Sequence, residues 1–144
     1  MDKDGLENLI PKNKFDNSTI NDLMKLNEDE ISIILPELFN WIKDFNWPIA
    51  AEITQVITKF PISLFPLLRK SLRGDEKDEV LKYWVIVKIL PKMPIDMQII
   101  LCEEIVRICR NPTDSENIEE VVDVAKEYLS NYRCRDIGLG KLDL

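Results

Sequence analysis

Apolar residues recur at intervals of three and four along nearly every long segment of the chain, and this spacing predicts α-helices. The clearest example lies between residues 115 and 130, where the apolar positions are Ile118, Val121, Val122, Ala125, Tyr128 and Leu129. Because these residues would share one face of a helix, we expect them to turn inward and the acidic residues between them to face solvent. The pattern predicts an all-α protein.

Turn and cap residues divide the helical pattern into three successive antiparallel helix pairs. The predicted pairs are 31–44 with 48–60, 62–73 with 76–90, and 94–110 with 115–130. Pro36 interrupts the first helix, which either kinks there or ends at Leu35 and begins again. The run Val85-Ile86-Val87 is typical of a strand, but the apolar block around it is too long for one. Because the block is apolar almost all round, we predict that it forms the most buried helix, covered on two sides.

A Trp–Pro pair joins the two helices of the first pair. Pro48 suits the first position of a helix, where its missing N–H is not needed, and it disfavours helical backbone at Trp47. The joint is therefore stiffer than a glycine turn would be. Trp84 instead lies within an apolar block without a polar face, so we expect it to be more buried than Trp47.

The segment LPELFNWIKDFNWPIAAEITQVI, residues 35–57, resembles a HEAT repeat. The likeness lies in the Leu-Pro-x-Leu of the first helix, in Asp44 of the turn, and in the small and aliphatic residues of the second helix. With the stretches LIPKNKFD, RGDE, LKYWV, RNPT and EEVVDVAKEYL, the chain resembles an uncharacterised bacterial family of small HEAT-like helical proteins. The resemblance implies a short HEAT-like stack of antiparallel helix pairs, an α-α superhelix, and assigns no activity.

The length and charge of the chain indicate its domain organisation, its partners and its location. We expect a single HEAT-like domain over residues 1–132 and a flexible C-terminal tail over 133–144. A net charge of −7 repels phosphate backbones, so we expect no nucleic-acid partner. No stretch is apolar enough for a membrane span or a signal peptide, which favours a cytoplasmic protein without membrane contact.

The chain carries none of the patterns on which catalysis commonly depends. It has no histidine, no nucleophile elbow and no glycine-rich phosphate loop, and its three cysteines form no zinc motif. We therefore expect that the protein is not an enzyme and binds neither a cofactor nor a metal. We interpret the chain as a protein-binding module. A more specific hypothesis is an immunity or antitoxin-like protein that masks a basic toxin. The alternative is a nucleic-acid-processing enzyme like the HEAT-like glycosylases, which use a Trp-lined cleft containing Asp.

The candidate partner-binding residues lie at the tips of the predicted pairs and along the last helix. Equivalent tips of stacked hairpins fall along one edge, and Trp, Tyr and Arg dominate binding hot spots. The candidates at the tips are Trp41, Asp44, Asn46, Trp47, Arg73, Asp75, Lys82 and Tyr83. The alternative is a purely structural role, in which the tryptophans only pack the joints and Asp and Asn cap helix ends.

A second group of candidates, Glu119, Glu120 and Asp123, belongs to the most acidic part of the chain. Between Asp114 and Glu127 six acids stand against one base. This imbalance predicts a protein partner with a basic face and a salt-sensitive association. The alternative is that these acids only keep a small protein soluble.

Overall fold

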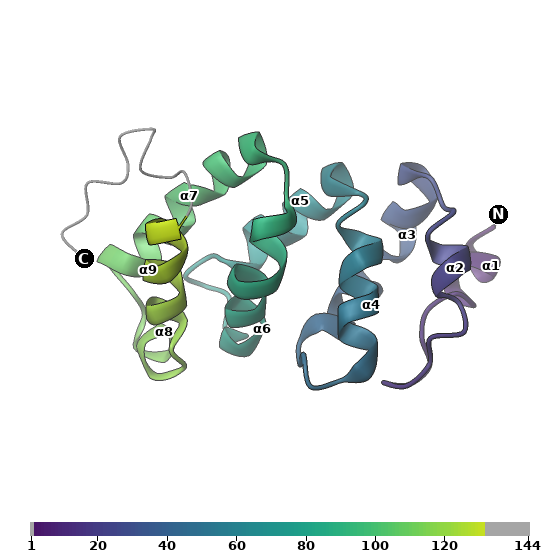
Figure 1. The fold of residues 1–144 in the computed structure, drawn as a ribbon, viewed down its shortest axis with the longest axis horizontal. Coiled ribbons are helices and arrows are strands. Elements are labelled where there is room, and N and C mark those ends of the chain that lie inside the picture. The colour runs from purple at the N-terminus through teal and green to yellow at the C-terminus, as the bar shows by residue number, and fades with distance from the viewer. Residues whose placement is uncertain (1, 132–144) are drawn as a thin grey trace. The chain divides into compact units, whose positions relative to one another are not determined.

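The structure is a computed structural model that describes residues 2–131, and it is all-α (Figure 1). Every regular element within those residues is helical, and no strand occurs among them. The prediction of an all-α protein is confirmed, including the helical assignment of the Val85–Val87 run. None of the helices in the described range is long and apolar enough to cross a membrane.

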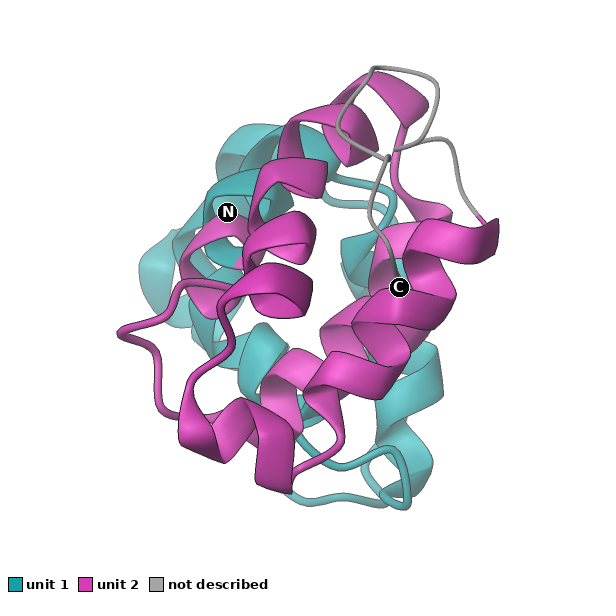
Figure 2. Cartoon of the chain, turned by 90° about the vertical axis from the view of Figure 1, so that its left-hand side faces the viewer, with its two compact units in different colours: residues 1–67 teal, residues 68–144 magenta. Residues whose placement is uncertain are grey.

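The chain divides into two compact units, residues 1–67 and residues 68–144 (Figure 2). They are called unit 1 and unit 2 below. The single domain over residues 1–132 stays a prediction, and the tail predicted for residues 133–144 lies outside the described residues.

Unit 1 contains α1 (Lys3–Glu7), α2 (Ile20–Leu23), α3 (Glu28–Phe39), the 3₁₀ turn η1 (Asn40–Ile42), α4 (Pro48–Ile57) and the first part of α5 (Pro61–Ser71). Within it α3 packs against α1 and α4, and α2 packs against α4. The fully buried side chains of its core include Leu6, Leu23, Ile31, Ile34, Leu38, Ile42, Ala50, Ile53, Val56, Ile57 and Leu64. These are the apolar positions of the helical pattern, so burial of one face drives the folding of this unit.

Pro36 lies inside α3, which continues from Glu28 to Phe39 without ending at the proline. A proline in a helix leaves the carbonyl four residues earlier without its usual donor. Both Pro36 and Ser32, the residue four positions before it, are exposed, so water can supply the missing hydrogen bond. Pro66 of α5 is exposed too and follows the exposed Ile62 by four residues. The two prolines are tolerated because they lie on solvent-facing sides of their helices.

The Trp–Pro joint has the backbone that its sequence predicts. Pro48 occupies the first position of α4, and Trp47 before it is extended, with φ −71° and ψ 129°. Asp44 closes the turn: its carboxylate accepts a hydrogen bond from the Asn46 N–H at 2.8 Å, and its carbonyl accepts one from the Trp47 N–H at 3.0 Å. The rings of Trp41 and Trp47 meet edge to face, with centroids 5.6 Å apart. Such contacts give the turn a defined geometry.

Unit 2 contains the end of α5, α6 (Glu79–Trp84), the π-helical turn η2 (Val85–Ile89), the 3₁₀ turn η3 (Leu90–Lys92), α7 (Ile95–Arg110), α8 (Asp114–Ile118) and α9 (Val121–Asn131). α9 packs against α6, η2 and α7. The fully buried apolar side chains of this core include Leu72, Val85, Ile89, Leu90, Ile105, Ile108, Val121 and Ala125.

The helix predicted over residues 76–90 differs from the observed one in its bounds and in its regularity. The helix begins at Glu79, changes to a π-helical turn at Val85, and exposes 47% of Val80. Trp84 and Trp47 are both half-buried, so the predicted difference in burial between the two tryptophans is not evident. Trp84 packs instead edge to face against Tyr83, with ring centroids 5.0 Å apart.

The prediction of one continuous helix over residues 115–130 is wrong, because the chain turns between α8 and α9. Glu120 in this turn has a left-handed backbone, with φ 63°. Ile118, which the pattern places on the inner face, is 75% exposed, whereas Glu116 is fully buried. Residues two positions apart lie on opposite sides of a helix, so an inward Glu116 forces Ile118 outward. The reason that Glu116 turns inward lies in its charged partners.

Replacing Glu120 with glycine tests the turn. Left-handed backbone costs a non-glycine residue roughly 1–2 kcal/mol, while glycine adds roughly 0.5–1 kcal/mol of entropy cost. We therefore expect Glu120→Gly to be about 1 kcal/mol more stable than Glu119→Gly, which removes the same charge at a residue with φ −90°. Urea denaturation of both variants measures the difference. Equal stability of the two would contradict the left-handed turn.

Candidate functional site

Four charged side chains meet inside unit 2: Glu79 and Lys82 of α6, Arg107 of α7, and Glu116 of α8. They are called the ion cluster below. Lys82 and Glu116 are 0% exposed and Glu79 is 6% exposed. Arg107 is partly exposed, with 27% of its side chain accessible. Buried charges are stable only when paired and hydrogen-bonded, so the geometry of the cluster decides its role.

The Glu116 carboxylate is the centre of the ion cluster. Arg107 donates to it through both terminal nitrogens, Nη1 to Oε1 at 2.9 Å and Nη2 to Oε2 at 2.7 Å. Lys82 Nζ donates to Oε2 at 2.9 Å, and the Thr113 N–H donates to Oε1 at 2.8 Å. Two cations and a backbone amide therefore replace the water that the carboxylate loses on burial.

Local sequence signals place each member of the cluster. Asp78 caps α6 by accepting the Leu81 N–H at 3.0 Å, which starts the helix so that Glu79 and Lys82 share a face at a spacing of three. Thr113 and Glu116 form a capping box at the start of α8, in which the Thr113 hydroxyl accepts the Glu116 N–H at 3.2 Å. The capping box holds the Glu116 carboxylate against the end of α7, where Arg107 lies.

Arg107 extends the cluster to the loop after α5. Its Nη2 donates to the Leu72 carbonyl at 3.0 Å, and its Nε donates to Glu104 at 3.2 Å within α7. Through Arg107, Lys82 and Glu116 the cluster thus joins the end of α5, α6, α7 and the start of α8. Glu79 is its least satisfied member: Oε1 accepts from Ser115 at 3.1 Å, while the buried Oε2 has no hydrogen-bond partner among the described residues.

Glu116 and Arg107 keep their charges at neutral pH. Burial alone raises the pKa of Glu116, but the hydrogen bonds from Arg107, the Thr113 N–H and Lys82 outweigh burial and lower this pKa to about 2, from the ordinary 4.5. The same hydrogen bond to Glu116 raises the pKa of Arg107. A carboxylate with a pKa near 2 is a poor proton acceptor at neutral pH. The geometry therefore suits an anchor between helices.

Lys82, a predicted partner-binding residue, is fully buried and cannot contact a partner at the surface. This prediction is wrong because the ammonium pairs with Glu116 and Glu79 in the interior. Sequence reasoning missed Glu116 and Arg107 altogether. The Thr-x-x-Glu spacing of a capping box that begins at Thr113 could have pointed to Glu116. The apolar residues on both sides of Lys82 could have indicated that this lysine is buried.

The other predicted site residues lie at the surface or half-buried. In unit 1 the joint brings together Trp41, Asp44, Asn46 and Trp47. In unit 2 Arg73 and Asp75 form an exposed ion pair at 3.8 Å, and Tyr83 is half-buried against Trp84. The acids Glu119, Glu120 and Asp123 are all exposed. A single edge shared by the tips of the helix pairs stays a prediction.

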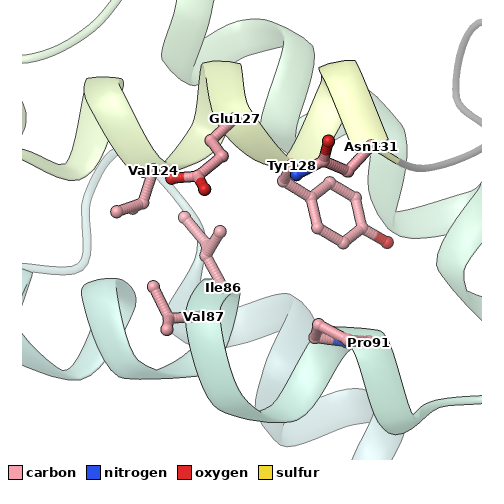
Figure 3. A pocket seen from close by; sticks show the side chains of 7 residues that line it. All are labelled: Ile86, Val87, Pro91, Val124, Glu127, Tyr128 and Asn131. Carbon is pink, nitrogen blue, oxygen red and sulfur yellow. The ribbon is translucent and has the colours of Figure 1, made fainter.

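A pocket, called the α9 pocket below, opens between η2–η3 and α9 in unit 2 (Figure 3). Its free volume is about 390 Å³, including the open mouth. The residues that line it are Ile86, Val87, Pro91, Val124, Glu127, Tyr128 and Asn131. None of these was a predicted site residue, since the apolar ones are typical of a helical core and Glu127 of a solvated helix face. Only the packing of a π-helical turn against α9 brings them together.

These features define the class of the protein: an all-α chain with a salt-bridged interior in unit 2 and a small pocket beside an acidic helix. Residues 9–129 match the model of a family described as a domain of unknown function (DUF5071), and the chain belongs to this family. No curated protein matches the chain. Membership of an uncharacterised all-helical family is as the sequence predicts, while its bacterial origin and HEAT-like stacking stay predictions. No group of three or more Cys, Asp or Glu side chains among residues 2–131 could hold a metal ion.

Replacing Lys82 with methionine should lower the free energy of unfolding by about 3–5 kcal/mol, because it leaves two buried carboxylates short of a cation. Lys77→Met is the matched control: Lys77 is exposed just before α6, and its loss should cost less than about 0.5 kcal/mol. Urea denaturation measures both variants. A cost below about 1 kcal/mol for Lys82→Met would contradict the buried ion pair.

Acid should remove the contribution of Glu116 to stability. Its folded pKa of about 2 lies below the ordinary 4.5, so on acidification the unfolded chain takes up this proton first. The contribution is complete above pH 4.5 and disappears as the pH falls toward 2. The difference in unfolding free energy between wild type and Glu116→Gln should therefore shrink over that range, measured by urea denaturation at several pH values. Glu103→Gln, which removes an exposed acid of α7, is the control and should stay close to wild type. Parallel curves for wild type and Glu116→Gln would contradict the lowered pKa.

Proposed function

We propose that the protein is a non-enzymatic protein-binding module whose partner presents a basic face. The observation that carries this proposal is the acidic face of α8 and α9, which consists of the exposed residues Asp114, Glu119, Glu120, Asp123 and Glu127. Lys126 is the exposed base among them. The sixth acid of this stretch, Glu116, is buried in the ion cluster and does not belong to the face, contrary to the sequence expectation.

The acids of this face have no neutralising partner among the residues that the structure describes. None of the five forms an ion pair within residues 2–131. Unpaired carboxylates of one sign produce a field that speeds the encounter with a basic partner and repels an acidic one. Because salt screens such a field over about 8–10 Å, the association should be fastest at low ionic strength.

A more specific form of the proposal is an immunity or antitoxin-like role in the bacterial cytoplasm, in which the acidic face covers a basic toxin. The size and net charge of the chain support it. Catalysis has less support, because the buried carboxylate with the largest hydrogen-bond network has a pKa near 2. Binding of duplex DNA at low salt would favour the nucleic-acid-processing alternative instead.

The test is charge reversal on the acidic face. The partner is first captured from lysate of the source cell on the immobilised chain and identified by mass spectrometry. The triple variant Glu119→Lys, Glu120→Lys, Asp123→Lys should then lower its association rate about tenfold or more at low salt and flatten the salt dependence.

A matched triple variant provides the control. Asp22→Lys, Glu37→Lys and Glu103→Lys change the net charge equally at exposed positions of α2, α3 and α7. This variant should keep most of the wild-type association rate and its salt dependence. If both triple variants behave alike, net charge alone governs the association, and the acidic face is not the binding surface.

A further inference from the structure

We propose that the α9 pocket receives an aliphatic or aromatic side chain from a partner segment in which a neighbouring lysine or arginine pairs with Glu127. This inference rests on the proposed function and specifies which part of the acidic face makes close contact. Four observations support it: the backbone of one wall, the fixed position of Tyr128, the charge at the mouth, and the size of the pocket.

The first wall of the pocket is built on an unusual backbone. Ile86 and Val87 belong to the π-helical turn η2, in which the Leu90 N–H bonds to the Val85 carbonyl five residues earlier. π-helical turns are rare and occur frequently at functional sites. With Pro91 and Val124 these residues form the apolar part of the lining, and polar groups of α9 form the rest. An apolar side chain of a partner that enters this pocket would be transferred out of water, which favours binding.

The second wall is held in place before any partner binds. The Tyr128 hydroxyl donates a hydrogen bond to Gln98 Oε1 at 2.5 Å, and Gln98 Nε2 donates to the Met93 carbonyl at 2.7 Å. The ring of Tyr128 extends from α9 toward Pro91 (Figure 3). Because its position is fixed, little side-chain entropy remains to be lost when the pocket is filled.

The charge at the pocket is negative. Glu127 is its charged lining residue, and its carboxylate turns toward Ile86 (Figure 3). Glu127 is exposed and forms no ion pair with another described residue. The lysines of the opposite elements, Lys88 and Lys92, do not line the pocket. A cation next to the inserted apolar side chain would therefore meet the Glu127 carboxylate, which has no ion-pair partner between residues 2 and 131.

The size of the pocket favours a side chain of a protein over a free small molecule. Its 390 Å³ includes open solvent at the mouth, so the enclosed space is smaller than that of typical ligand sites, which hold roughly 300–1,000 Å³. A shallow site of this kind buries one anchor side chain, while the surrounding acidic face supplies the remaining contacts. Anchors of this type carry most of the affinity in many protein interfaces.

The probe is a phage-displayed library of random linear peptides, selected on the full chain at low salt. We expect enriched peptides to place an aliphatic or aromatic residue beside lysine or arginine. Synthetic versions should bind Val87→Trp, which fills the pocket, and Glu127→Gln at least about tenfold more weakly than wild type. Glu103→Gln removes an exposed acid of α7 that neither lines the pocket nor belongs to the acidic face, and it should bind like wild type. Thermal melting by circular dichroism verifies that each variant is folded.

The following outcomes would overturn the inference. The first is equal peptide affinity for wild type, Val87→Trp and Glu127→Gln, or enrichment of acidic peptides. The second is displacement of the peptides by a synthetic segment of residues 132–144, which would assign the pocket to the chain's own C-terminal segment. The third is self-association of the wild type that Val87→Trp abolishes, which would assign it to a second copy. If the triple charge reversal slows the partner while Val87→Trp does not, the proposed function stands and the pocket inference fails.

Discussion

The carboxylate of Glu116 is the constraint on which the arrangement of unit 2 depends. A buried carboxylate must find cations or amides, and here it finds both guanidinium nitrogens of Arg107, the ammonium of Lys82 and the Thr113 N–H. Each partner comes from a different element, so the requirement fixes α6, the end of α7 and the start of α8 together. Because Glu116 must point inward, α8 is held in one rotation, which leaves Ile118 exposed and requires a turn before α9.

That turn determines what the surface of α9 presents. After Glu120 the helix begins again with Val121 and Ala125 inside and with Asp123 and Glu127 outside. The inner face packs on α7 and on the π-helical turn, where the α9 pocket opens. The acids of the outer face form no ion pair with another residue of the described range 2–131, and Glu127 lies where the two faces meet. A buried ion cluster and a proposed binding surface are thus linked through the rotation of one short helix.

The sequence predicted the helices of both units well, because apolar spacing reports burial directly. The periodic residues of α3 and α4, such as Ile31, Ile34, Ile53 and Ile57, are all in the core. The prediction failed where charge competed with this pattern. Spacing alone placed Ile118 inside and Glu116 outside, and only contacts with Lys82 and Arg107, 34 and nine residues away along the chain, reverse the two. The same long-range pairing turned Lys82 from a surface candidate into an interior one. The α9 pocket could not be predicted either, since it depends on how a π-helical turn packs against a distant helix.

The most direct test of this account is a double-mutant cycle between Lys82 and Glu116. It compares the unfolding free energies of wild type, Lys82→Met, Glu116→Gln and the double variant, each from urea denaturation at neutral pH. If the buried pair is the constraint that we describe, the two changes are strongly non-additive, with a coupling energy of about 2 kcal/mol or more in favour of the wild-type pair. Additive losses, with a coupling energy near zero, would show that the two side chains do not depend on each other and would contradict the account.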